Sequence, residues 1–272
     1  MNEQDRQALE RRARQLRRDV LQMTYEAQSG HPGGSCSLAD LMAYLYFYRL
    51  RYDTASPKSP SRDRLVLSKG HAAPVLYAAL GESGFFPKEE FHRLRKIGSL
   101  LQGHPCIAIP GVDATTGSLG LGLSLGTGMA IAAKRRQPGV RVHVILGDGE
   151  LDEGQVWEAA MAAPRFALDN LVAIIDRNRY QNDGATEEIL PLEPLADKWR
   201  AFRWNVIEID GHNFDEIDEA FCRADRTKGA PTLILAHTVK GKGASYLLDQ
   251  PQLHYTPPTA EQLAGALREL AD

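Results

Sequence analysis

The sequence of 272 residues contains few cysteines, few aromatic residues and no long apolar run. Cys36, Cys106 and Cys222 form neither a CxxC pair nor an even set for disulfides, which is typical of a reducing compartment and predicts a cytoplasmic protein. The strongly apolar run at residues 41–48 is far shorter than the roughly 20 residues that a membrane span needs. Residues 1–18 lack the apolar core of a secretory signal, so we expect none.

The net charge is also small. Thirty-two Lys and Arg against 35 Asp and Glu give −3, which leaves no basic footprint for nucleic acid or for an anionic membrane, and we expect neither as a partner. A chain of this length can bury roughly 70–75% of its unfolded surface, so it can fold without disulfides or a structural metal. No repeat or break in composition divides it. The sequence therefore predicts a single domain over residues 1–272.

Apolar patterning predicts an α/β fold. Helical spacing predicts an N-terminal helix over about residues 1–28, a buried helix over 38–48 and a helical tail over about 256–272. Short β-branched runs predict strands at 142–146, 171–175, 205–209 and 232–236, with helices at 153–166 and 215–224 between some of them. Short apolar strands that alternate with helices indicate a central, mainly parallel sheet with helices on both faces.

Polar residues follow two of the predicted strands. Asp148 comes after the strand at 142–146, and Asn178 comes after the next strand along the chain. A right-handed crossover between the two strands would bring both residues to one edge of the sheet, where ligands bind in such folds. A carboxylate, a carboxamide and a nearby carbonyl suit Mg²⁺ when a ligand's phosphates complete its shell. The alternative is that Asp148 only caps the following helix.

Twelve of the 24 glycines lie between Gly98 and Gly154. Residues 115–124 are a glycine-rich loop before a predicted helix at 125–136, and its amides could bind an anion. Neither a GxGxxG motif nor a phosphate-binding P-loop is present. The alternative is that these small residues allow close helix packing.

Three of the eight histidines adjoin glycine or proline, and a fourth lies shortly after Pro251. At such positions an imidazole can approach a ligand and transfer protons: His31, His71, His104 and His254. A single histidine of this kind is more often an ordinary loop residue. The other four lie within or at the ends of predicted strands or in a charged helical run, and we assign them structural roles: His92, His143, His212 and His237.

Taken together, these motifs resemble the transketolase family, and more narrowly the N-terminal subunit of a split, two-gene transketolase. The resemblance rests on GHPGGS at 30–35, LSKGHA at 67–72, GHP at 103–105, TGSLG at 116–120 and GDGELDEGQVWE at 147–158. The motifs run in family order and cover nearly the whole chain. The resemblance implies the diphosphate-domain fold that binds thiamine diphosphate.

The resemblance also implies a set of site residues. Asp148, Asn178 and the carbonyl of Tyr180 would hold Mg²⁺ or Ca²⁺. The implied cofactor contacts are His71, Gly117, Ser118, Leu119, Gly149, Glu150, Asn178 and His254. His31 and His254 would move protons at the sugar hydroxyls. His104 would bind the donor's terminal hydroxyl, and Glu153 would lie at a subunit interface near the aminopyrimidine.

The implied reaction is transfer of a two-carbon ketol unit from a ketose, or ketose phosphate, to an aldose or aldose phosphate. The implied partner is a C-terminal subunit that carries the pyrimidine domain, in a heterotetramer with two copies of each chain. Three alternatives stay open: a transketolase-like enzyme of specialised metabolism, the α component of a 2-oxoacid dehydrogenase, and a non-catalytic homologue. Cys106, Leu121, Tyr180 and Asn182 depart from the usual family pattern and leave the substrate pocket open.

Overall fold

Five parallel strands form one sheet, in the order β1-β2-β3-β5-β4, in a computed structural model that describes residues 1–248, 250 and 253–271. The strands are β1 (Arg64–Leu67), β2 (Val142–Gly147), β3 (Leu171–Arg177), β4 (Asn205–Asp210) and β5 (Thr232–His237). The predicted α/β class with a parallel sheet is confirmed. The sequence did not predict β1, because this strand has only four residues and follows an irregular loop.

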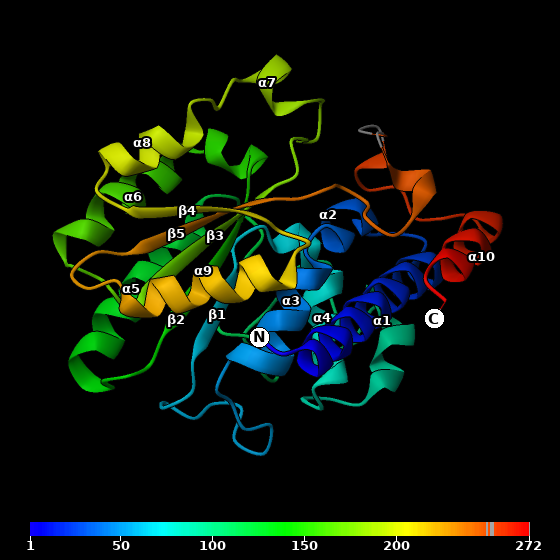
Figure 1. Cartoon of the computed structure of the whole chain (residues 1–272). Helices are drawn as coiled ribbons and strands as arrows, with labels where there is room; N and C mark the ends of the chain where they lie inside the picture. Colours follow the sequence, from blue (N-terminus) through cyan, green and yellow to red (C-terminus); the bar gives the residue numbers. More distant parts are fainter. Residues whose placement is uncertain (249, 251–252, 272) are drawn as a thin grey trace.

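Helices precede, connect and follow the strands (Figure 1). The α-helices are α1 (Glu3–Ala27), α2 (Pro32–Cys36), α3 (Ala39–Tyr44), α4 (Ala73–Glu82), α5 (Leu121–Arg136), α6 (Gly154–Arg165), α7 (Thr186–Ile189), α8 (Leu195–Ala201), α9 (Phe214–Arg226) and α10 (Ala260–Glu269). Shorter helical turns are η1 (Leu45–Arg49), η2 (Gly70–Ala72), η3 (Lys88–Arg93), η4 (Gly149–Asp152) and η5 (Ser245–Leu247).

Two of the predicted helices have different bounds in the structure. The helix predicted over 38–48 is divided into α3 and the π-helical turn η1. Helix α5 begins at Leu121, four residues before the predicted start, because Gly120 adopts a φ of 85° and lets the chain enter the helix earlier. The glycine-rich loop is therefore shorter than the sequence suggested, and part of it is helix.

Alternate strand residues pack on opposite faces of the sheet. Ile145 and Ile174 belong to one apolar cluster, which α1, α3, α4 and α9 cover. Val144 and Ala173 belong to a second cluster, which α5, α6 and α8 cover. This alternation is the period of two that an extended strand imposes, and both faces are apolar because helices cover both. Within the described residues, no helix is long and apolar enough to cross a membrane.

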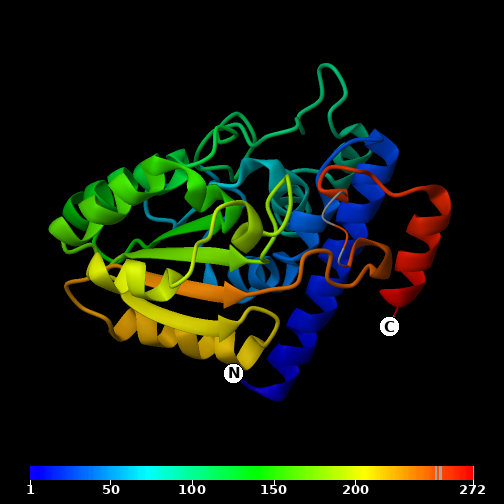
Figure 2. The same ribbon diagram turned by 90° about the horizontal axis from the view of Figure 1, so that it is seen from above.

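The strands end together at one edge of the sheet, where the arrowheads in Figure 2 point in the same direction. Gly147 at the end of β2 pairs in register with Asp176 near the end of β3. In this register Asp148 follows β2 opposite Arg177, and Asn178 follows one residue later, so both leave the sheet at the same edge. The C-terminal helix α10 lies against α1, and Arg18 donates to the Leu267 carbonyl at 3.0 Å.

Candidate cofactor and metal site

A cavity of about 250 Å³ opens at the carboxyl edge of the sheet. Its walls come from the segments that follow β1, β2, β3 and β5, together with the start of α2. This is the position at which parallel α/β sheets bind ligands, because loops from several strands converge there.

Asp148 lies at the base of the cavity and is buried. Its Oδ1 accepts from the Gly149 amide at 2.9 Å, and its Oδ2 accepts from the Arg177 guanidinium at 3.2 Å. Burial, together with the nearby Asp176 carboxylate, raises the pKa of Asp148 to about 6. The carboxylate thus caps the short turn η4 after β2, whereas the helix that follows, α6, has Glu153 at its N-cap. Asp148 also lies in an environment that a bound cation would stabilise.

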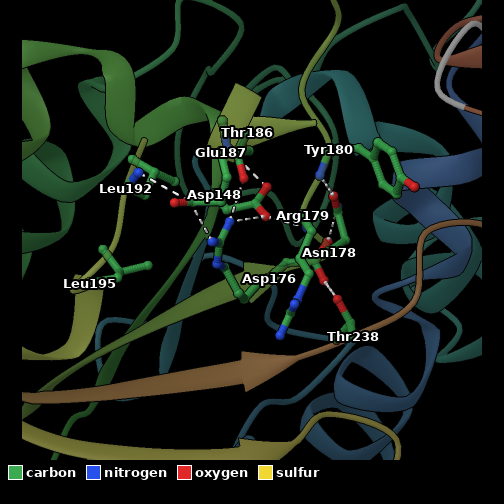
Figure 3. A network of polar contacts seen from close by, with 12 residues as sticks. Asp148, Asp176, Asn178, Arg179, Tyr180, Thr186, Glu187, Leu192, Leu195 and Thr238 are labelled. Atoms are coloured by element: carbon green, nitrogen blue, oxygen red, sulfur yellow. Dashed lines mark hydrogen bonds and ion pairs between the residues drawn. The ribbon is translucent and has the colours of Figure 1, made fainter. Parts of the chain in front are cut away.

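Asn178 and Tyr180 extend the same site from the end of β3. The Asn178 amide donates to Asp176 Oδ2 at 3.1 Å, which turns its Oδ1 toward the backbone amide of Tyr180, also at 3.1 Å. Asp176 is held in turn by Lys69, Ser37 and Thr238. Figure 3 shows Asn178 close to Asp148, with the Tyr180 ring directed away from both.

These groups fit a divalent cation that shares its coordination with a phosphate ligand. Among the described residues, no three His, Cys, Asp or Glu side chains converge to form a cation site of their own. The groups that would hold such a cation are one carboxylate, one amide oxygen and a backbone carbonyl, from Asp148, Asn178 and Tyr180 in the cavity lining. All are hard oxygen ligands of the kind that Mg²⁺ and Ca²⁺ prefer, and Mg²⁺ commonly completes its shell with phosphate oxygens.

Three histidines meet on the other side of the cavity. The ring centroids of His31 and His71 are 5.1 Å apart, those of His31 and His254 are 5.2 Å apart, and those of His71 and His254 are 5.4 Å apart. Burial and neighbouring cations lower the pKa of His31 to about 4 and that of His254 to about 3, and they also lower the pKa of His71. The Nδ1 atom of His31 is buried without a hydrogen-bond partner. This unpaired polar atom is available to a ligand.

Two lysines that the sequence reasoning did not select also line the cavity. Lys69 is buried and donates to the Gly34 carbonyl at 2.9 Å, as well as pairing with Asp176. Lys240 lies 3.4 Å from His254 Nδ1, and burial and Lys69 lower its pKa to about 8. Each lysine adjoins a glycine shortly after a strand, at Lys69-Gly70 and Lys240-Gly241. This Lys-Gly pattern was the signal in the sequence by which the two lysines could have been selected.

The lysines and histidines that line the cavity are cationic and neutral hydrogen-bond donors, which fit a diphosphate. A Cβ atom at Gly34 would lie 3.7 Å from Lys69 Nζ and 3.9 Å from His71 Nε2, so glycine leaves room between two donors. A Cβ at Gly149 would lie 2.5 Å from the Gln181 Cβ, so only glycine allows this turn to pass so close. Burial and then the repulsion between neighbouring cations lower the pKa values of Lys240 and of the three histidines, and an anion in the cavity would offset that repulsion.

The sequence of the glycine-rich loop allowed two interpretations, an anion-binding loop and close helix packing, and each describes a part of this segment. Gly117 and Leu119 line the cavity, whereas Ser118 between them is exposed. At the start of α5, the amide of Gly120 donates at 2.9 Å to Glu150, a carboxylate of the protein itself. Later glycines of the helix allow close packing, since a Cβ at Gly126 would overlap with Val144 Cγ2.

Glu150 lines the cavity, but its carboxylate is occupied by the protein. Besides the Gly120 amide, it accepts from Ser68 and, at 3.0 Å, from the Gly147 amide. Burial raises its pKa, and these donors oppose that effect. In this structure the Glu150 side chain supports the two loops that frame the cavity. Its predicted contact with a cofactor stays a prediction.

The remaining predicted residues lie at or beyond the rim. His104 is exposed, and its Cδ2 is 3.3 Å from the position of a Cβ at Gly117. Glu153 is exposed at the start of α6 and packs against Gly120, outside the cavity lining. The four histidines assigned structural roles also lie outside the lining: His92, His143, His212 and His237.

The fold and the cavity define the class: an α/β domain whose cavity at the carboxyl edge of a parallel sheet fits a diphosphate and a divalent cation. The family model for the thiamine diphosphate binding domain of transketolase matches residues 6–270. The chain therefore belongs to the transketolase family and comprises its thiamine diphosphate binding domain. This match favours transketolase over the 2-oxoacid dehydrogenase α component.

Two curated relatives match along nearly their whole length. An apulose-4-phosphate transketolase subunit of Phocaeicola vulgatus is 44% identical over 266 residues, which cover 98% of this chain and 95% of the relative. The 6-deoxy-6-sulfo-D-fructose transketolase subunit SqwG of a Clostridium species is 47% identical over 263 residues, which cover 96% of both chains.

Solved transketolases share the fold. The structure from Campylobacter jejuni superposes with a TM-score of 0.92 at 32% identity and covers 99% of this chain. The chain spans 43% of the length of that protein. It likewise matches 43% of human transketolase, at 45% identity over 275 residues. This chain corresponds to one part of those longer transketolases. It corresponds to nearly the whole of each of the two shorter relatives above.

Proposed function

We propose that this chain is the diphosphate-binding subunit of a two-chain transketolase that uses thiamine diphosphate and Mg²⁺ or Ca²⁺. The assembled enzyme transfers a two-carbon ketol unit from a ketose to an aldose, either of which can carry a phosphate. The partner is a second chain with the pyrimidine half, in a complex of two copies of each, in the cytoplasm. The observation that carries the proposal is the convergence of Asp148, Asn178, two lysines and three histidines on one cavity.

The names of the two relatives that match along nearly their whole length support the two-chain arrangement and the substrate class. Both are called transketolase subunits, and the names refer to a phosphorylated and a sulfonated sugar. In the longer family members, the part that matches this chain is 43% of the protein. We infer that the partner chain supplies the rest.

The cation and the diphosphate would be bound by residues on the floor of the cavity. Asp148, Asn178 and the Tyr180 carbonyl hold the cation. His71, Lys240 and the backbone around Gly117 and Gly149 bind the diphosphate oxygens. When bound, thiamine diphosphate supplies the carbanion chemistry that breaks and forms the carbon–carbon bonds.

The histidines would act on the sugar. His31 and His254 are neutral at pH 7 because burial lowers their pKa values, so each has one unprotonated ring nitrogen that could accept a proton from a sugar hydroxyl. In His31 the Nδ1 atom has no partner, whereas His254 Nδ1 lies 3.4 Å from Lys240. With a diphosphate bound, the pKa values of His31 and His254 would rise toward neutrality, the range in which imidazole transfers protons best. His104 at the rim binds the far hydroxyl of the donor, and Glu153 faces the partner chain near the aminopyrimidine.

The test is reconstitution from separately purified chains. We expect no ketol transfer by this chain alone or by the partner alone. Together they give activity that depends on thiamine diphosphate and a divalent cation, and light scattering gives the mass of two copies of each chain. Ketol transfer by this chain without a partner would show that the two-chain proposal is wrong.

A further inference from the structure

Arg177 connects the proposed cation ligand Asp148 to a segment outside the cavity. Its side chain is only 2% exposed, although it lies at the end of β3 beside Asn178. One end nitrogen, Nη1, donates to Asp148 Oδ2 at 3.2 Å and to Thr186 Oγ1 at 2.6 Å. The other, Nη2, donates to Glu187 at 2.8 Å and to Glu193 at 3.0 Å. One buried guanidinium thus joins three carboxylates.

The two glutamates lie on the surface. The side chains of Glu187 and Glu193 are 42% and 55% exposed, whereas that of Asp148 is 1% exposed. Figure 3 shows Thr186 and Glu187 grouped beside Asp148, on the opposite side from Asn178 and Thr238. The buried guanidinium therefore links Asp148 at the base of the cavity to two carboxylates that are exposed to solvent.

The segment that carries these glutamates also supplies the other side of the cation site. The amide of Arg179 donates to Asp148 Oδ2, and the Arg179 carbonyl accepts from the amide of Thr186 at 3.0 Å. Tyr180, which offers the proposed carbonyl ligand, pairs with Ala185 in this fold-back. Movement of Thr186 or Glu187 would therefore move a ligand of the cation as well.

The charges around Arg177 explain why it pairs with Glu187 and Glu193 as well as with Asp148. A lone guanidinium beside Asp148 would compete with a divalent cation for the carboxylate and would repel that cation. Glu187 and Glu193 together offset its charge, so that Asp148 stays available. We propose that Arg177 is a positioning residue for the cation and that the exposed Glu187 and Glu193, acting through Arg177, set the cation affinity of a site that they do not touch. This inference rests on the proposed cation site.

The test uses the double variant Glu187→Gln/Glu193→Gln, which removes two surface charges without emptying the core. Glu188→Gln is the matched control, because Glu188 is exposed on the same short helix. Mg²⁺ affinity is measured by calorimetry in the complex with the partner, at saturating thiamine diphosphate. Hydrogen exchange of residues 179–193 is followed in parallel.

We expect the double variant to bind Mg²⁺ about two- to fivefold more weakly, in line with the modest strength of exposed ion pairs, and to exchange faster over 179–193. The difference should narrow at about 1 M salt, where exposed charges are screened. Arg177→Met should weaken binding by about 10- to 100-fold, as is typical when a partner of a metal ligand is lost. Glu188→Gln should match the wild type.

The outcomes separate this inference from the proposed function. If the wild-type complex shows no Mg²⁺-dependent cofactor binding, the proposed function is wrong, and this inference is wrong with it. Normal wild-type binding, with the same Mg²⁺ affinity in the double variant and in Glu188→Gln, would overturn the inference alone.

Discussion

Replacing Lys240 with Met should make the cofactor-free protein more stable and the cofactor-bound protein harder to form. Lys240 is 5% exposed in the wall of the cavity, and burial and Lys69 oppose its charge. Methionine has a similar length and keeps an apolar stem in the space beside Gly33, where a Cβ would lie 3.4 Å from Lys240 Cγ. The variant removes a positive charge that destabilises the cofactor-free fold and that would bind the diphosphate.

The magnitude follows from the pKa. Lowering the pKa of Lys240 from 10.5 to about 8 corresponds to roughly 3 kcal/mol, which solvent at the cavity mouth reduces to about 1–2 kcal/mol. Below pH 8 the lysine is charged in the folded and the unfolded chain, so the full penalty is present. Between pH 8 and 10.5 the unfolded chain holds more protons, and the stability of the wild type rises with pH as the penalty disappears.

The assay is thermal unfolding of the cofactor-free chain as a function of pH, combined with calorimetry of thiamine diphosphate binding. At pH 7 we expect Lys240→Met to unfold roughly 2–6 °C higher than the wild type, with the gain disappearing above pH 10. Cofactor affinity should fall by about 10- to 100-fold, the equivalent of one hydrogen bond to a charged group. The exposed neighbour Lys242→Met is the control. A variant that is less stable at pH 7, or that binds cofactor normally, would refute the reasoning.

Four further substitutions test other parts of the site and fold. His104→Ala should raise the donor KM and lower kcat while cofactor affinity stays nearly constant, because His104 lies at the rim; a collapse of cofactor binding in calorimetry would contradict that role. Gly149→Ala should weaken cofactor binding more than it lowers Tm, because its Cβ would meet Gln181 Cβ at 2.5 Å. Gly126→Ala should lower stability by about 1–3 kcal/mol in denaturant titrations, since its Cβ would overlap with Val144. Gly128→Ala, with nothing within 4 Å, should raise stability by up to about 1 kcal/mol, and equal effects of these last two changes would refute the packing argument.

The parallel sheet and the position of Asp148 and Asn178 in the lining of one cavity could be predicted because both follow from local patterns. Short apolar strands that alternate with helices leave few topologies, and a right-handed crossover places the ends of consecutive strands together. The register then brings Gly147 opposite Asp176, so the residues that follow face one site. The histidines beside turn-forming residues could also be selected, because loops at that edge of the sheet line the ligand site.

Other parts of the site depend on contacts between distant segments. Lys69 and Lys240 are separated by most of the chain, and nothing local shows that both line one cavity. The start of α5 was expected to bind a ligand anion, but Glu150 supplies one, because the turn after β2 folds against Gly120. Which carboxylate fills a helix N-terminus is decided by tertiary packing, and a single sequence carries no signal for it.

The most direct test of the central claim is the affinity of the assembled two-chain enzyme for thiamine diphosphate, measured with and without Mg²⁺. The wild type should bind the cofactor much more tightly when Mg²⁺ is present. Asp148→Ala should lose this Mg²⁺ dependence while its partner binding stays intact. Cofactor binding by Asp148→Ala with wild-type affinity and wild-type Mg²⁺ dependence would contradict the assignment of the cation site.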